Sequence, residues 1–147
     1  MKNPHPSASG GDTNTFNNSG NGQTTLNVAG LTSILNKTFN TASVAPYVIG
    51  SNGVNQQTLI IANNGNIQIT SRAANNPRVD AAVSLGTDKK TGNYTFRNDQ
   101  PANTLTLAGS VAGSSSGATA GAKTLNIEGA GSTLLLGNVT PGGAFSL

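Results

Sequence analysis

The segment from Gly117 to Thr124, Gly-Ala-Thr-Ala-Gly-Ala-Lys-Thr, comes close to the sequence of a phosphate-binding loop. Such a loop needs Gly-x-x-x-x-Gly-Lys-Ser/Thr between a strand and a helix, so that backbone N–H groups and the helix N-terminus hold the phosphates. Here Ala122 replaces the second glycine, and the residues from Thr124 onward are patterned as a strand. We therefore interpret the segment as an ordinary Gly/Ala turn, and we expect Lys123→Ala to have almost no effect.

Acid–base and nucleophilic chemistry have few residues to use in this chain. Ser and Thr nucleophiles need an adjacent base, and the single histidine, His5, lies between two prolines in a predicted loose tail. Metal ligands are equally scarce, because the chain has no cysteine and only five acidic residues: Asp12, Asp80, Asp88, Asp99 and Glu128. The sequence therefore predicts no catalytic residue, no cofactor and no metal site.

Polysaccharide cleavage is the most serious enzymatic alternative. It needs two carboxylates within roughly 5 to 9.5 Å of each other, or a carboxylate-bound Ca²⁺ beside a basic residue. Suitable residues lie in one part of the chain, where two of them could meet across adjacent repeats: Asp80, Asp88, Lys89, Arg97 and Asp99. We favour the simpler interpretation that these are turn residues beside Gly86 and Gly92.

Glycan binding without catalysis usually uses exposed aromatic side chains as stacking platforms. Tyr47 and Tyr94 are the candidates in this sequence. Tyr94 alternates with Phe96, which predicts that it points inward from a strand. Tyr47 is therefore the better candidate, and Tyr47→Ala should remove any such binding.

The composition limits partners and location. Of the 147 residues, 9% are charged and 4% are aromatic, and the net charge of +3 includes no basic run longer than Lys89-Lys90. Nucleic-acid-binding proteins cluster basic residues and interleave stacking aromatics, so we expect no nucleic-acid partner. We expect no membrane span, because no apolar run approaches roughly 20 residues. Residues 1–12 lack an apolar signal-peptide core and are predicted to be a flexible tail.

Short strands are the elements that must position any site. Apolar residues sit two apart, as in Leu105 with Leu107 and Leu125 with Ile127, and Thr or Asn alternates with them. This pattern turns one face of each strand inward, while Gly, Asn and Pro turns separate the strands. The only candidate helix is Leu31–Phe39, where apolar residues are spaced by three and four, and we do not favour it.

Four sequence blocks recur in the same order in the two halves of the chain. In the first half they begin at Thr15, Thr25, Thr58 and Asn66, and in the second half they begin at Thr95, Thr104, Thr124 and Thr133. The second and third blocks lie farther apart in the first half than in the second, so the difference in length falls in the connection between them. We therefore expect residues 13–147 to form one segment with a loop insertion within 31–57.

A longer period, of about 29 residues, links Ile67 to Phe96, Phe96 to Leu125, and Leu105 to Leu134. Three short strands with their turns occupy that length, which corresponds to one coil of a parallel β-solenoid. We therefore predict an all-β fold with coils of about 29 residues. Leu125 would stack over Phe96, and Leu134 over Leu105.

The register of this coil is imperfect, because Ile69 falls against Asn98. An antiparallel β-sandwich therefore remains the alternative, with blocks nine positions apart forming hairpins and Phe96 pairing directly with Leu105. Hairpins favour two-residue Asn-Gly or Asp-Gly turns, and Asn64-Gly65 is the one good case. We favour the solenoid.

The blocks Thr104–Gly109 and Thr124–Gly129, which alternate with Gly-, Asn-, Ser- and Thr-rich turns, resemble the β-strand repeats of autotransporter passengers. The likeness covers most of residues 13 to 147 and is strongest after Asn93. The resemblance implies a right-handed parallel β-helix that is exported to the bacterial surface. The sequence has no counterpart of the family's C-terminal membrane barrel, which leaves the route of export open.

Together these observations predict a non-enzymatic structural or adhesive segment of a secreted bacterial surface protein, a stalk or fibre building block outside the cell or on its surface. A polysaccharide-degrading or glycan-binding β-helix is the alternative function. Surface glycans or a host receptor are candidate partners. Replacing Leu125 or Ile127 by aspartate should unfold the C-terminal coils.

The end of the sequence adds an expectation about assembly. The segments Thr133–Leu136 and Ala144–Leu147 stop in mid-pattern without a charged or helical cap. Repeat proteins normally cover such ends, because exposed strand edges recruit other strands. We therefore expect further coils after Leu147 in the parent protein and end-to-end self-association of the isolated chain.

Overall fold

The computed structural model describes residues 12–18, 24–30, 33–86, 91–113, 121–140 and 145–146. All regular elements in these ranges are strands. Their bounds are β1 Thr13–Phe16, β2 Thr25–Leu26, β3 Ile34–Phe39, β4 Val48–Ile49, β5 Thr58–Ile69, β6 Arg78–Val79, β7 Ala82–Leu85, β8 Gly92–Asn98, β9 Thr104–Leu107, β10 Val111–Gly113, β11 Lys123–Glu128, β12 Ser132–Leu135, β13 Val139–Thr140 and β14 Phe145–Ser146. The predicted flexible tail, 1–12, lies outside the described residues except for Asp12.

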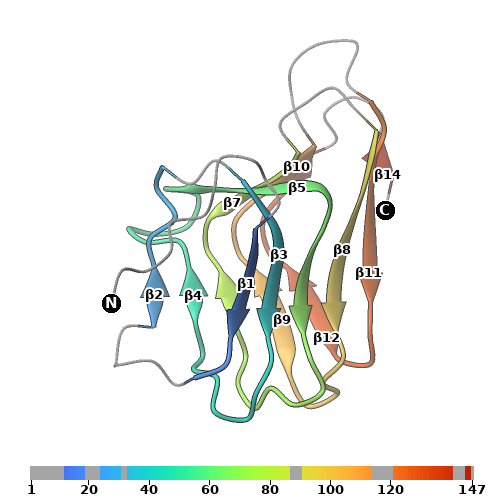
Figure 1. Cartoon of the computed structure of the whole chain (residues 1–147). Coiled ribbons are helices and arrows are strands. Elements are labelled where there is room, and N and C mark those ends of the chain that lie inside the picture. The colour runs from blue at the N-terminus through green and yellow to red at the C-terminus, as the bar shows by residue number, and fades with distance from the viewer. Residues whose placement is uncertain are drawn as a thin grey trace.

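Every strand pairing among the described residues is parallel, and the strands form a β-solenoid with coils of roughly 28 residues. In Figure 1 the colour passes from blue to red across the molecule, because successive coils lie side by side along one axis. The predicted all-β solenoid is therefore confirmed. The antiparallel sandwich is wrong, because Phe96 and Leu105 lie in different sheets.

Three walls enclose the interior of the solenoid. Wall A contains β1, β3, the second half of β5, β8, β11 and β14; wall B contains β2, β4, β6, β9 and β12; wall C contains the first half of β5, β7, β10 and β13. The two halves of β5 serve different walls because the strand bends between them. Asn64 has a φ of 64° at this bend. A Cβ on Gly65 would lie 2.2 Å from the Leu35 carbonyl oxygen, so only glycine fits there. The Asn64-Gly65 pair therefore makes a bend within β5 and not a hairpin.

The predicted register is correct at one contact and shifted at others. Ile67 pairs with Phe96, as predicted. Phe96 pairs with Ile127 instead of Leu125, which pairs with Tyr94. The reason lies in the connections between walls C and A: Lys123 stands ten positions after Gly113, the end of β10, whereas Gly92 stands seven positions after Leu85, the end of β7. The longer connection shifts the register of β11 against β8.

A one-residue shift separates the predicted and observed partners in wall B. Leu105 pairs with Thr133 and not with Leu134. Leu134 pairs instead with Thr106, which points outward. The predicted period of 29 residues therefore does not hold between β9 and β12, where register partners such as Leu105 and Thr133 lie 28 positions apart.

Corresponding sequence blocks in the two halves of the chain lie on the same wall only for the first two blocks. The blocks at Thr58 and Thr124 lie on walls C and A, and those at Asn66 and Thr133 lie on walls A and B. Residues 31–57, where a loop insertion is predicted, contain β3 and β4. The candidate helix is wrong as well, because β3 lies within it and buries Ile34 and Phe39 against the core.

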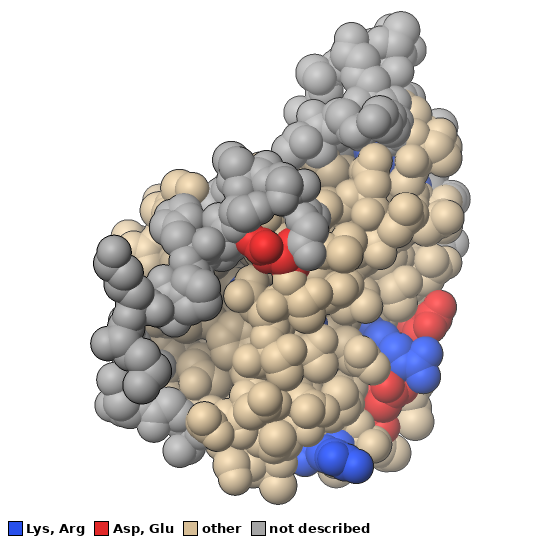
Figure 2. All heavy atoms as spheres, in the orientation of Figure 1, with Lys and Arg blue, Asp and Glu red and all other residues tan. Residues whose placement is uncertain are grey.

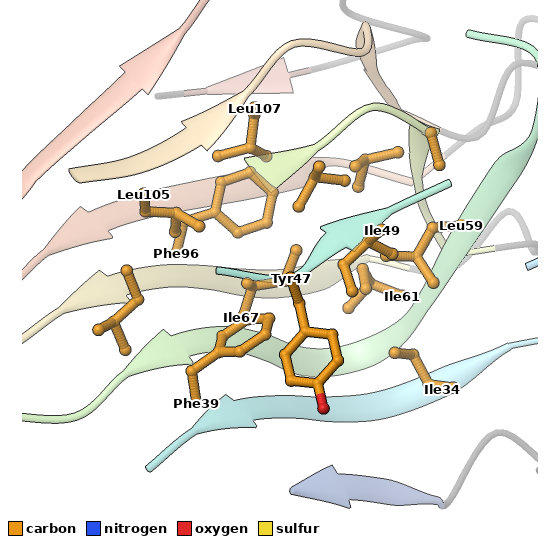
Figure 3. Packing of buried hydrophobic residues seen from close by; sticks show 14 of the residues in the cluster. Ile34, Phe39, Tyr47, Ile49, Leu59, Ile61, Ile67, Phe96, Leu105 and Leu107 are labelled. Atoms are coloured by element: carbon orange, nitrogen blue, oxygen red, sulfur yellow. The ribbon is translucent and has the colours of Figure 1, made fainter. Parts of the chain in front are cut away.

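Rows of mostly apolar side chains run along the interior, each built from matching inward positions of successive coils. In wall B the row is Leu26, Ile49, Val79, Leu107 and Leu135, matched position by position through the strand pairings. Its three middle members are fully buried and its two outer members are half-buried. Figure 3 shows side chains from the walls pointing toward one another, with Phe96 near Leu105 and Leu107, and Phe39 near Tyr47. Stacking of coils therefore builds the core.

Asparagine and glutamine side chains join the coils at their corners. Asn98, which faces Ile69 in the register, is fully buried and donates to the carbonyls of Asn103, at 2.7 Å, and Ser132, at 2.8 Å. Gln57 similarly accepts a hydrogen bond from the Val28 backbone at 2.9 Å. Such bonds supply partners to buried polar groups without using charge, which accounts for an Asn-rich, charge-poor composition.

Leu125 and Ile127 offer a test of the inward register. Leu125 is fully buried, whereas Ile127 is 41% exposed. Leu125→Asp should lower the free energy of unfolding by several kcal/mol, because it buries an unpaired carboxylate. Ile127→Asp should cost about 1 kcal/mol or less, which corrects the expectation that either change unfolds the chain. Urea unfolding followed by circular dichroism at low protein concentration measures both, and equal losses would contradict the difference in burial along β11.

Candidate functional site

The carboxylates proposed for polysaccharide cleavage lie on separate walls. Asp80 follows β6 in wall B and accepts a 2.6 Å hydrogen bond from Arg78 Nε. Asp99 follows β8 in wall A and is held by Arg97 Nε at 2.8 Å from both of its oxygens. Asp88 and Lys89 lie outside the described residues. The structure therefore joins each of these two carboxylates to an arginine of its own strand segment.

A cluster of polar and charged groups crosses three neighbouring coils on the outer face of wall A. Gln68, Arg97 and Glu128 are register neighbours, and Arg97 Nη1 lies 3.3 Å from Glu128 Oε2. Gln68 donates to Asp99 at 3.0 Å. The hydrogen bond from Arg97 holds the pKa of the Asp99 carboxyl below its ordinary value, aided by the bond from Gln68. An ionised carboxylate engaged in this way is a poor proton donor at neutral pH.

The rest of the described surface that is visible in Figure 2 carries few charged side chains. Among the residues that the structure describes, no three His, Cys, Asp or Glu side chains come together in a group that could hold a metal ion. The Arg97 cluster is solvent-exposed, with 46% of the Arg97 side chain accessible. Exposed ion pairs of this kind contribute little to stability.

The two tyrosines considered as glycan platforms are both buried. Tyr94 points inward, as predicted, and is fully buried. Tyr47 was expected to be the exposed candidate, and this is wrong, because its side chain packs against Phe16 with ring centroids 4.9 Å apart. Its hydroxyl donates to the Asn18 carbonyl at 3.3 Å. Neither ring therefore offers a face to a sugar, and Tyr47→Ala would chiefly remove core packing.

Lys123 belongs to a buried polar cluster and not to a surface turn. It is the first residue of β11, and its side chain is fully buried with Nζ 5.9 Å from the centre of the Tyr94 ring. The Tyr94 hydroxyl donates to Asn63 Oδ1 at 2.5 Å. Gly86 leaves room for these groups, because a Cβ there would lie 2.5 Å from Tyr94 Oη and 3.2 Å from Lys123 Nζ.

The burial of Lys123 corrects the expectation that Lys123→Ala is nearly neutral. The phosphate-loop alternative lacks the helix it needs, because strand β11 begins at Lys123. Residues 114–120, which include the first part of that motif, lie outside the described residues. Sequence reasoning had one usable signal here, since Lys123 stands two positions before the inward Leu125.

A second buried lysine, Lys37, lies near the first coil. Its Nζ lies 5.1 Å above the centre of the Phe16 ring, and the side chain is 3% exposed. Burial lowers the pKa of Lys37 from 10.5 to about 8. Sequence analysis missed it, although it stands two positions before the inward Phe39 and so shares its face of β3.

The last coil presents apolar side chains to solvent. Of the four large hydrophobic residues that are exposed in the described part of the chain, three lie there: Ile127 at 41%, Leu134 at 45% and Leu136 at 58%. The fourth is Val54, at 39%, in the loop before β5. Concentration of exposed apolar side chains in one region marks an interaction surface more often than isolated ones do. This region is the candidate functional surface of the described chain.

No family model, curated protein or solved structure matches this chain. In the described part of the chain, no helix is long and apolar enough to cross a membrane.

The buried Lys37 amine should make stability depend on pH. Between pH 8 and 10.5 the unfolded chain holds a proton on this amine that the folded chain has released, so the free energy of unfolding rises with pH. The full difference is about 3 kcal/mol, and it is lost as the pH falls from the unfolded pKa to the folded one. Lys37→Met should remove this rise and stabilise the protein at pH 7. Urea unfolding of both proteins from pH 7 to 10 tests this, and equal slopes would contradict it.

Proposed function

We propose that this chain is a non-enzymatic structural segment of a secreted bacterial surface protein, comparable to an autotransporter passenger, which serves as a stalk or adhesive spacer. Its location is outside the cell or on the bacterial surface. Its task is mechanical: it holds the segments attached to its two ends apart along one axis.

The observation that carries this proposal is the direction of the hydrogen-bond ladders. All described strand pairings are parallel, and they link successive coils through three walls. The apolar row of wall B passes through five strands without a polar member. A structure of this kind gains stability coil by coil and is extended by adding coils, which suits a spacer of variable length.

The polar groups support a structural role in preference to a chemical one. Asp80 and Asp99 are paired with arginines, and Tyr47 is in the core. The Asn and Gln side chains with buried bonds connect coils to each other, as Asn103 does by donating to the Ala73 carbonyl at 2.8 Å. These buried Asn and Gln side chains therefore stabilise the solenoid.

The proposed location is supported by two sequence features. The repeats resemble those of exported passengers, and the chain contains no cysteine. A cysteine-free chain can cross an envelope unfolded without forming wrong disulfides, and a fold that grows coil by coil can be completed outside.

Single-molecule pulling tests the mechanical role. The chain would be held through cysteines added at its two ends, since it has none of its own. Coils of roughly 28 residues should give stepwise lengthening of about 100 Å per event, because extended chain spans up to about 3.6 Å per residue. Release of the whole chain in one event at very low force would contradict a stack that resists tension.

A glycan panel tests the alternative function. Incubation with a broad set of polysaccharides, followed by product analysis and binding measurements, should give neither cleavage nor saturable binding. Cleavage that disappears in Asp80→Asn or Asp99→Asn would replace the structural proposal by a polysaccharide-degrading one. Arg72→Gln, which removes a charge at another exposed position, is the control for these changes.

A further inference from the structure

Within the described residues, the inward rows of all three walls end at the last coil in side chains that are not fully buried. The inward rows end there at Ile127 in wall A, Leu135 in wall B and Val139 in wall C, and Ile127 is 41% exposed while the other two are half-buried. The preceding members, Phe96, Leu107 and Val111, are at most 1% exposed. The residues one coil earlier are fully buried because a following coil covers them. Ile127, Leu135 and Val139 have no such coil over them in the described residues.

The strand edges at this end are available as well. Within the described residues, β12 is the last strand of wall B and pairs with β9 alone. In wall A, β14 pairs with β11 only at Lys123 and Thr124, so Leu125 to Glu128 have no register partner in β14. A parallel strand could therefore join β12 without displacing any described strand.

The first coil offers a surface of matching kind. In wall B the first described strand is β2, and its Leu26 begins the same inward row that Leu135 ends. In wall A, Phe16 begins an inward row, stacked on Phe39 with ring centroids 5.0 Å apart. Both Leu26 and Phe16 are half-buried. In wall B the row therefore begins and ends with an apolar residue, on strands of the same direction. In wall A the row that ends at Ile127 begins at Asn14, two positions before Phe16.

We infer that the open last coil binds the first coil of a second copy of this chain, with β12 of one copy paired in parallel with β2 of the next and Leu135 placed over Leu26. This contact repeats the coil-on-coil interface already present inside each copy, in which Leu107 lies over Val79 and Leu135 over Leu107. In wall A the same stacking brings β1 of the second copy beside Ile127 of the first, with Asn14 at the matching row position.

Stacking of this kind is head-to-tail, so it uses two different surfaces and does not close on itself. Each added copy presents a new open last coil, and repeated addition gives a filament along the solenoid axis. The contact deepens the structural role proposed above and rests on it, because it turns a spacer into a fibre building block.

The experiment measures molar mass by light scattering after size-exclusion chromatography, across a hundredfold range of protein concentration. The unmodified chain should show an average mass that rises with concentration through multiples of the monomer. Ile127→Asp should weaken association at least about tenfold, because it places a charge at the open core. Val54→Asp is the matched control, since Val54 has nearly the same exposure, 39%, and lies elsewhere; it should change association less than about twofold.

A change at the first coil tests the head-to-tail direction. The carbonyls of Thr24 and Leu26 accept bonds from β4, so the Thr25 N–H points to the opposite edge of β2. Thr25→Pro removes that outer donor and leaves the bonds to β4 intact. Thr25→Pro and Ile127→Asp should each be monomeric alone, and their equimolar mixture should form a dimer and nothing larger.

Three results would overturn the inference. They are a strictly monomeric unmodified chain over the whole range, loss of association in Val54→Asp equal to that in Ile127→Asp, or a Thr25→Pro chain that still dimerises, which would mean contact between two last coils. Circular dichroism checks that each variant is folded, and Leu136→Asp, at a position 58% exposed, replaces Ile127→Asp if that variant does not fold. A monomeric chain that still lengthens coil by coil under force would refute the stacking and leave the stalk role standing.

Discussion

Parallel pairing between successive coils is the constraint on which the rest of this structure depends. Each coil from β3 to β13 contributes one short strand, or half of β5, to each wall. Such a strand gains stability only when the coils on either side are present. The same pairing aligns Ile49, Val79 and Leu107 into one apolar row. The apolar core, the hydrogen bonds at the corners and the exposed last coil all result from the stacking of similar coils along one axis.

The stack also explains how polar residues are tolerated inside it. Asn98 interrupts an apolar row, yet its side chain has bonds to two carbonyls in the corner and accepts one from the Gln100 backbone at 3.1 Å. Lys37 and Lys123 each lie beside an aromatic ring. Uncharged Asn and Gln can bridge coils at every corner without repulsion between layers, whereas like charges stacked in register would destabilise them.

Alternation and period predicted the fold, but they did not predict its full register. Leu105 and Leu107 are buried as their spacing indicates, and Ile67 pairs with Phe96 as the period indicates. Leu125 is displaced from Phe96 because the connection before β11 is longer than the one before β8, and no local pattern measures how a loop is accommodated. Tyr47 was misplaced because its burial depends on Phe16, a residue of the preceding coil. Lys37 and Lys123 stand at positions that the alternation assigns to the inward face, but a charged residue is expected at the surface, so their burial was not predicted.

Disulfide trapping in this cysteine-free chain tests coil stacking most directly. Thr104 and Ser132 are register partners in wall B, and cysteines at partnered positions in adjacent strands have suitable geometry for a bond. Thr104→Cys with Ser132→Cys should form an intramolecular disulfide rapidly under mild oxidation. The pair Arg97→Cys with Thr104→Cys, which a hairpin between β8 and β9 would bring together, should remain reduced. Fast bonding of the second pair without bonding of the first would contradict the solenoid.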